Sequence, residues 1–228
     1  MVTLKKGDFV SIDYIGRLAF NDNIFDLTDE KLAKENKLHD PKLTYGALTI
    51  CIGEKHLLEG LNEELEGKET ESEFKVTLKP EQAFGKKNPK LIKIVSKGAF
   101  KKQDMEPYPG MQIQLGNAMA TVRTVSGGRV IVDLNHPLAG RELVYDVKVH
   151  KKIDDVEEQV VCLLKMNLFL NKKHFKIEIK EKTAEIKVDK KVPEEVQKTF
   201  SELVKKLISS LEKVVFISEE QKQPLKNN

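Results

Sequence analysis

The sequence contains no tryptophan, only two cysteines and no long apolar run, and each absence narrows the possible classes of protein. No segment approaches the roughly 18 apolar residues of a membrane-spanning helix, and no charged-then-apolar leader follows Met1. We therefore expect neither membrane insertion nor export. Cys51 and Cys162 lie in apolar runs without metal-ligand spacing. They predict buried thiols rather than a disulfide, and hence a reducing, cytoplasmic location.

Signatures of covalent catalysis and of nucleotide binding are also missing. The chain has no glycine-rich phosphate loop, no nucleophile elbow and no paired cysteine or histidine ligands. A formal charge of +3 is too small to indicate nucleic-acid binding. Five scattered histidines favour structural or surface roles over metal binding: His39, His56, His136, His150 and His174. We expect no covalent enzyme, no metal and no cofactor.

What the chain does contain is 228 residues, 39% hydrophobic and 33% charged, enough for more than one soluble domain. Alternating apolar residues predict amphipathic strands at residues 8–18, 72–79 and 141–151. Between the last two, residues 86–134 predict a small all-β module of short strands, with a glycine-pair hairpin at residues 126–128.

An acidic cluster at residues 154–158 predicts a domain boundary. Beyond it, we expect strands at residues 160–170, 175–180 and 184–188, and then an amphipathic helix from Pro193 to about Val215. The apolar face of this helix is wider than a small sheet would cover, so we expect homodimerisation through the C-terminal region.

The stretch of residues 49–67 changes its hydrophobic period midway, from two residues to that of a helix. It predicts a strand, a turn at Gly53, and a helix with Glu54 at its N-terminal end and Gly67 as its C-cap. Its leucines at positions 57, 58, 61 and 65 lie on one helical face. From these residues alone, the helix is either core scaffold or the floor of a pocket.

Further apolar and aromatic motifs accompany this stretch in a definite order. They are residues 10–18 (VSIDYIGRL), Phe25-Asp26, Ile52-Gly53 leading to residues 57–61 (LLEGL), Ala83-Phe84-Gly85, residues 135–140 (NHPLAG) and residues 143–147 (LVYDV). In this order they resemble the FKBP-type peptidyl-prolyl isomerases, specifically the SlyD-like branch with a chaperone domain inserted in the flap, of the archaeal long type. The resemblance extends to about residue 153.

This resemblance implies an α+β fold in which an FKBP-like antiparallel sheet wraps on a short helix. Residues 1–86 and 131–153 would form the isomerase domain. Residues 87–130 would form the inserted all-β chaperone domain, and residues 154–228 a C-terminal α+β domain.

The resemblance also implies the activity and its site. The chain would be a peptidyl-prolyl cis-trans isomerase with chaperone activity on proline-containing unfolded polypeptides. Its site residues would be Tyr14, Phe25, Asp26, Ile52, Leu57, Leu58, Leu61, Phe84, Leu138 and Tyr145. Leu61 would be the floor, the aromatic residues and Leu138 the walls, and Leu57 and Leu58 the rim. Asp26 would be a carboxylate at the buried edge, anchored by the Tyr14 hydroxyl.

Three departures from the family accompany these assignments. Leu61 stands where many members have tryptophan, Phe84 lacks the hydroxyl of a common tyrosine, and the metal-binding tail of SlyD-type relatives is absent. In the insert, we expect exposed Met and aromatic side chains to hold unfolded chains: Phe100, Met105, Tyr108, Met111 and Met119. Alternatives are a decorative insert, a peptide-binding chaperone with little isomerase activity, and a ribosome- or RNA-associated protein.

Overall fold

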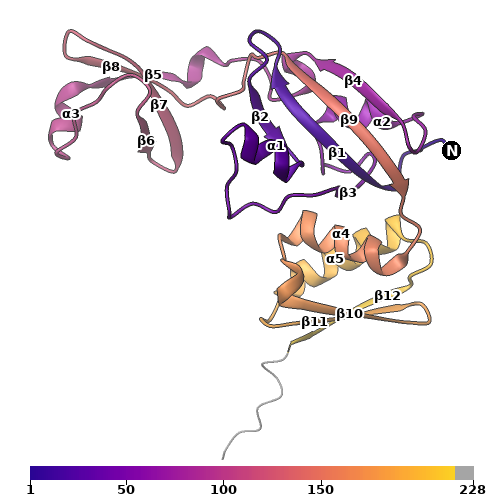
Figure 1. Cartoon of the computed structure of the whole chain (residues 1–228). Helices are drawn as coiled ribbons and strands as arrows, with labels where there is room; N and C mark the ends of the chain where they lie inside the picture. The colour runs from indigo at the N-terminus through magenta and orange to yellow at the C-terminus, as the bar shows by residue number, and fades with distance from the viewer. Residues whose placement is uncertain (219–228) are drawn as a thin grey trace, which may run out of the picture. The chain divides into compact units, whose positions relative to one another are not determined.

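The computed structural model describes residues 1–218 and has a mixed α+β fold (Figure 1). Its residues form two compact units. The first comprises Met1–Arg17, Ile24–Val76 and the chain from Tyr145 onward, and the second comprises Leu18–Asn23 and Thr77–Val144. Each unit is described separately below.

The sheet of the first unit has five strands, which carry four of the ten expected site residues, Tyr14, Phe25, Asp26 and Tyr145. They are β1 (Phe9–Leu18), β2 (Ile24–Leu27), β3 (Leu48–Cys51), β4 (Glu73–Leu78) and β9 (Leu143–Lys152). The order is β2-β1-β9-β4, with β3 also paired to β1. Both β2 and β3 run antiparallel to β1. The predicted strands at residues 8–18, 72–79 and 141–151 are confirmed to within two residues at each end.

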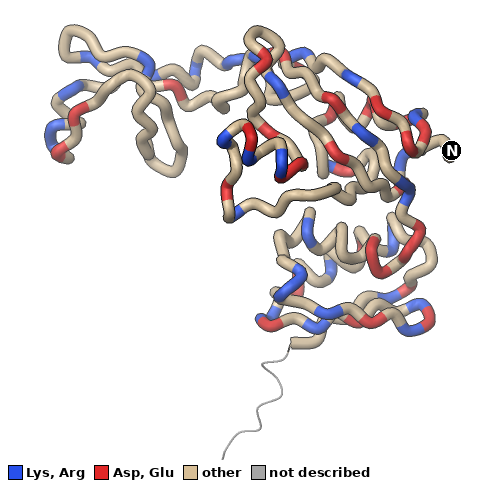
Figure 2. Tube along the Cα trace, in the orientation of Figure 1, with Lys and Arg blue, Asp and Glu red and all other residues tan. Residues whose placement is uncertain are grey.

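The outward face of this sheet is held by ion pairs between neighbouring strands. Lys148 Nζ lies 2.7 Å from Glu73 Oε1, and His150 Nε2 lies 2.7 Å from Asp13 Oδ2. Lysine and acidic residues are accordingly interspersed along these strands (Figure 2). Because such exposed pairs are individually weak, the sheet depends mainly on its buried face.

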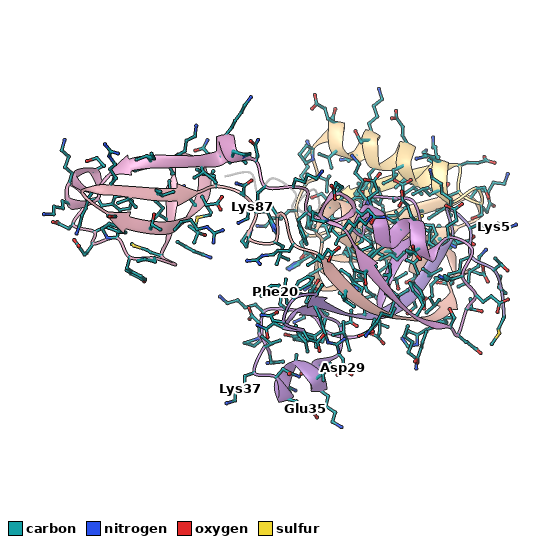
Figure 3. All side chains as sticks on the ribbon, turned by 90° about the horizontal axis from the view of Figure 1, so that it is seen from above. Lys5, Phe20, Asp29, Glu35, Lys37 and Lys87 are labelled. Carbon is teal, nitrogen blue, oxygen red and sulfur yellow. The ribbon has the colours of Figure 1, made fainter. Side chains whose placement is uncertain are left out.

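Two short helices connect these strands. In α1 (Glu30–Glu35), Asp29 caps the N-terminus by accepting the Leu32 N–H at 2.9 Å. The side chains of Glu35, at the end of this helix, and Lys37, just after it, point outward (Figure 3). Helix α2 (Glu59–Leu65) is shorter than predicted, because it begins at Glu59 and not near Glu54. Leu58 is its N-cap residue, so Leu57 and Leu58 precede the helix instead of lying on its face.

The second unit contains a four-stranded antiparallel sheet in the order β5-β8-β7-β6. Its strands are β5 (Ile92–Ser96), β6 (Gln112–Leu115), β7 (Ala118–Ser126) and β8 (Arg129–Asp133). The short strands predicted within residues 86–134 are present, and Gly127 and Gly128 form the hairpin with φ of 56° and 77°. The sheet continues to Asp133, three residues past the predicted end of the insert.

This module is not all-β, which corrects the prediction. Helix α3 (Lys97–Lys101) begins after Ser96, whose hydroxyl accepts the Gly98 N–H at 3.2 Å. Phe100 on this helix is buried among Ile113, Val122 and other residues of one sheet face. The helix has five residues, too few to give a hydrophobic period. Two 3-10 turns, Pro80–Gln82 and Pro89–Leu91, precede β5.

The strand predicted at residues 160–170 is wrong, because this segment is helix α4 (Val156–Leu168). The acidic cluster interpreted as a domain boundary is its start. Asp155 accepts the Glu158 N–H at 2.8 Å, and Glu157 and Glu158 lie in the positive first turn. The uninterrupted apolar run 160–164 fits either structure by its period, and the capping residues decide in favour of the helix.

The last predicted helix is also shorter than expected. Helix α5 (Glu194–Leu207) ends before a turn, and Val214 and Val215 lie in strand β12 (Lys213–Ser218). Strand β12 runs parallel to β11 (Thr183–Val188), which pairs antiparallel with β10 (Phe175–Lys180) after the 3-10 turn Lys172–His174. Helices α4 and α5 cover one face of this three-stranded sheet (Figure 1).

The C-terminal elements share a hydrophobic core with the five-stranded sheet. Phe9 of β1 and Cys51 of β3 belong to the same buried cluster as Val160 and Phe200. The Cys162 thiol also donates to the Thr49 carbonyl at 3.2 Å. Much of the apolar face of α5 is buried in this core, which weakens the reason for expecting a dimer.

Candidate active site

Tyr14 and Asp26 are joined by a hydrogen bond between neighbouring strands. The Tyr14 hydroxyl of β1 donates to Asp26 Oδ2 of β2 at 3.0 Å, as the sequence predicted. Burial of the phenol and the adjacent Asp26 carboxylate both raise the pKa of Tyr14 well above its ordinary value. Tyr14 therefore remains a hydrogen-bond donor at any physiological pH. Asp26 is exposed, so its predicted position at a buried edge is wrong.

Tyr145 of β9 packs against the rings of both Tyr14 and Phe25. The ring centroids are 5.8 Å apart in each pair, with interplanar angles of 60° and 88°. These are edge-to-face contacts, which aromatic rings prefer. The structure thus brings together four predicted site residues, and we call Tyr14, Phe25, Asp26 and Tyr145 the aromatic cluster.

Gly16 makes this cluster possible. A Cβ atom at position 16 would lie 2.9 Å from Phe25 Cζ, closer than real Cβ atoms approach, and 3.0 Å from Tyr145 Cε1, which is tighter than most real contacts. The β1–β2 register also shifts between Gly16 and Arg17. The sequence alone did not reveal the two rings that crowd this position.

The leucines of residues 57–61 occupy two different settings. Ile52 and Leu61 are nearly completely buried, at 1% and 2% exposure, whereas Leu57 and Leu58 are half-buried on the loop before α2. Asn62 holds this loop out of the helix. Its Nδ2 donates to the carbonyls of Glu54 and Leu57 at 3.0 and 3.3 Å. These bonds explain why α2 starts later than its leucine spacing predicted.

Phe84 and Leu138 lie in the second unit, where His136 connects them. The imidazole stacks on the Phe84 ring at 4.2 Å with an interplanar angle of 6°. Its Nδ1 accepts the Leu138 N–H at 3.2 Å. Sequence reasoning assigned His136 only a structural or surface role. Its place in the turn beside Leu138 was the available signal for this contact.

The five residues predicted as a peptide-binding surface of the insert divide into two groups. Phe100 is only 4% exposed, so the prediction that its side chain is exposed is wrong. The reason is helix α3, which turns this ring onto the sheet. Met105 and Met111 are partly buried against the same core. Tyr108 and Met119 are 61% and 60% exposed.

Two exposed isoleucines were missed. Ile92 and Ile94 of β5 are 43% and 67% exposed. Their partners on β8 are Asp133 and Ile131, and this register places both isoleucines on the sheet face opposite the Phe100 core. Met119 shares that face through Thr121, which also pairs with Asp133. The alternation of β5 was the signal, but it does not show which face is covered.

The cysteines are free, buried thiols, as predicted. Burial raises the pKa of both Cys51 and Cys162 to about 12, so neither is a ready nucleophile. Within residues 1–218, no group of three or more His, Cys, Asp or Glu is placed to bind a metal ion. In the same part of the chain, no helix has the length and apolar character that crossing a membrane requires.

Comparison with known proteins identifies the class. A short-type peptidyl-prolyl cis-trans isomerase of Methanocaldococcus jannaschii is 37% identical over 146 residues, which cover 64% of this chain and 92% of the relative. The FKBP-type isomerase SlyD of Pasteurella multocida is 37% identical over 106 residues, covering 45% of this chain and 53% of SlyD. The Escherichia coli FKBP-type 16 kDa isomerase is 35% identical over 104 residues, covering 43% and 68%.

These relatives are all peptidyl-prolyl cis-trans isomerases. The chain belongs to the FKBP-type peptidyl-prolyl cis-trans isomerase family. It spans most of the M. jannaschii relative but about half the length of the P. multocida SlyD. A family described as FKBP26, IF domain, matches residues 93–138, within the second unit.

Proposed function

We propose that this isomerase acts on prolyl bonds of unfolded or partly folded polypeptides, and that the aromatic cluster with Ile52, Leu57, Leu58 and Leu61 forms its site. The observation that carries the proposal is the convergence of Tyr14, Phe25 and Tyr145 beside a carboxylate held by the Tyr14 hydroxyl. Phe84 and Leu138 of the second unit, which His136 connects, are included among the proposed site residues on the family resemblance.

The chemistry needs no nucleophile. The barrier to prolyl rotation is about 18–20 kcal/mol and arises from amide resonance, which the twisted bond has lost. The twisted amide is less polar than the planar one, so an apolar site that removes water favours it over the ground state. In this proposal the aromatic rings supply the apolar walls. Asp26, fixed by Tyr14, orients the pocket and transfers no proton.

The proposed site is tested by substitution of Asp26. Asp26→Ala removes the partner of the Tyr14 hydroxyl, and we expect kcat/KM on a proline-containing peptide to fall by about two- to tenfold. Glu35→Ala, an exposed carboxylate at the end of α1, is the matched control and should retain full activity. Equal activity of the two variants would contradict the proposed role of Asp26.

We further propose that the second unit's four-stranded sheet binds unfolded clients through one exposed face. Ile92 and Ile94 are exposed on that face, with Met119 on the same face beyond Asp133 and Thr121, and β5 is an edge strand open to pairing with an extended peptide. Tyr108 adds a further exposed aromatic side chain. The match to FKBP26, IF domain, over residues 93–138 supports a distinct insert of the long type, and it extends eight residues past the predicted end at residue 130.

The double variant Ile92→Ser, Ile94→Ser tests this surface, with Lys93→Ser on the same strand as control. We expect the double variant to lose suppression of client aggregation while keeping activity on short peptides. The control should keep both. Unchanged aggregation suppression in the double variant would contradict the proposed client surface.

A second reading, a peptide-binding chaperone with little isomerase activity, is favoured by one observation. Leu61, the proposed floor, is only 2% exposed and offers a bound ring little surface. A refolding assay limited by prolyl isomerisation separates the two readings. In the first, catalytic amounts accelerate refolding; in the second, the chain slows aggregation and leaves the rate unchanged.

Self-association through the C-terminal region and a cytoplasmic location stay predictions. Val196 of α5 is 36% exposed, whereas Phe200, Val204 and Ile208 are buried within the chain. Sedimentation at high micromolar concentration tests the dimer, and a monomer there would count against it. The two free thiols support a reducing location.

A further inference from the structure

The loop of residues 53–58, which we call the rim loop, carries Leu57 and Leu58 and leads into α2. Asn62 of α2 holds this loop through three side-chain hydrogen bonds. Asn62 Oδ1 accepts the Gly53 N–H at 3.2 Å, and its Nδ2 donates to the Glu54 and Leu57 carbonyls. Because Asn62 follows Leu61, these bonds tie the rim loop to the proposed floor.

His56 connects the rim loop to two other elements of the chain, β3 and α4. Its Nδ1 accepts the Cys51 N–H at 3.1 Å, which joins the ring to the end of β3. On the other side, Nε2 lies 3.3 Å from the side-chain amide of Asn167, a residue of α4. Because Nδ1 accepts, the neutral ring carries its proton on Nε2, which donates to the Asn167 amide when the amide oxygen faces the ring. The imidazole thus connects β3 of the isomerase sheet to a helix of the C-terminal region.

A second C-terminal helix reaches the same loop. Lys206 Nζ of α5 lies 3.1 Å from Glu54 Oε1. The Lys206 side chain is 68% exposed, so solvent screens this ion pair and it contributes little. His56 is half-buried and its bond to the Cys51 N–H is partly shielded from water, whereas Asn167 is exposed. Of the two connections, only the one through His56 also reaches the end of β3.

We propose that His56 and Asn167 are positioning residues for prolyl isomerisation, through which the C-terminal region holds Leu57 and Leu58 in the conformation that binds the peptide. This inference rests on the proposed site, because it assigns Leu57 and Leu58 to its rim. Between Gly53 and Leu57, the rim loop has two backbone hydrogen bonds, from the Glu54 N–H to the Cys51 carbonyl and from the His56 N–H to the Glu54 carbonyl, and side chains supply its other hydrogen bonds there. Loss of the Asn167 contact frees His56, and the peptide must then order the loop as it binds.

Asn167→Ala tests the proposal, with Lys165→Ala on the same helix as control. Lys165 is exposed and makes no contact with the rim loop in the described structure. We expect Asn167→Ala to lower kcat/KM by about three- to tenfold, mainly through a higher KM, while Lys165→Ala matches the wild type. A KM for Asn167→Ala within twofold of the wild-type value would overturn the proposal.

Asn167→Asp supplies a readout that a merely structural role would not move. A carboxylate beside Nε2 accepts its proton and favours the imidazolium ion, as Glu54 does from the rim loop. We expect this variant to keep a near-wild-type KM at neutral pH. As the pH is lowered below neutral, its activity should begin to fall at a higher pH than the activity of the wild type does. An acid limb that coincides with that of the wild type would also overturn the proposal.

Asp26→Ala separates this inference from the proposed function. If Asp26→Ala is impaired while Asn167→Ala is not, the site stands and the positioning role fails. If both variants match the wild type, the proposed site itself fails.

Discussion

A Cβ atom on Gly16 would lie 3.0 Å from Cε1 of Tyr145, so the absence of a side chain on β1 sets how closely Tyr145 approaches. Gly16→Ala should displace the rings of Tyr145 and Phe25 and cost about 1–3 kcal/mol in the free energy of unfolding. Isomerase activity should fall with it. Gly98→Ala is the control, because its Cβ would meet only the Ser96 hydroxyl, at 3.4 Å. Equal unfolding midpoints for the two variants would contradict this account of the cluster.

Tyr14→Phe keeps the ring contact with Tyr145 but removes the hydroxyl that Asp26 accepts. Because the apolar walls remain, we expect a loss of about two- to tenfold in kcat/KM and little change in near-ultraviolet circular dichroism. The measurement is peptide isomerisation at several substrate concentrations. Full activity would show that the carboxylate needs no anchor, whereas complete loss would indicate proton transfer or another role in the chemistry.

Phe100 and Met119 should behave in opposite ways. Phe100 is 4% exposed, so Phe100→Ala should destabilise the four-stranded sheet by about 3–5 kcal/mol, visible as faster hydrogen exchange in β6 to β8. Met119 is 60% exposed, and Met119→Ser should leave exchange unchanged but weaken client binding. Reversed results would show that Phe100, and not the opposite face, contacts the client.

Stability should depend on pH through His56. Burial lowers the pKa of His56, opposed by Glu54, so the folded protein keeps the ring neutral below the ordinary value. The unfolded chain takes up a proton near pH 6.5. It therefore binds more protons than the folded chain just below that pH, and this contribution to stability falls as pH drops from about 7.

His56→Gln removes this titration but leaves the other charged groups around it, including Glu54 and Lys206, in place. Between pH 7.5 and 5.5, the free energy of unfolding of the wild type should decrease more than that of His56→Gln. Urea denaturation at both pH values measures the two decreases. Identical decreases would mean that His56 protonates equally in both states.

The sequence predicted the parts of the fold that depend on local patterns. Alternation located β1, β4 and β9, and a glycine pair located the hairpin between β7 and β8. The order of the motifs singled out residues that do meet around Tyr145. What the patterns could not supply was any distinction that depends on packing.

Three elements illustrate this limit. The apolar run in α4 carries no usable period, and its helical state follows from the cap at Asp155 and from packing against β3 and β10. The late start of α2 depends on Asn62, whose bonds to the rim loop outweigh the helical spacing of the leucines. His56 contacts Asn167 and His136 stacks on Phe84, in both cases a residue far away in the sequence. No local sequence pattern reveals such contacts.

A chemical-shift map recorded while a proline-containing tetrapeptide is added tests the central claim most directly. The account predicts that the perturbed backbone amides gather at Tyr14–Gly16, Phe25–Asp26, residues 52–61 and Tyr145. Amides of the outward, charged face, such as Glu73 and Lys148, should not move. Shifts confined to that outward face, or to the four-stranded sheet of the second unit alone, would contradict it.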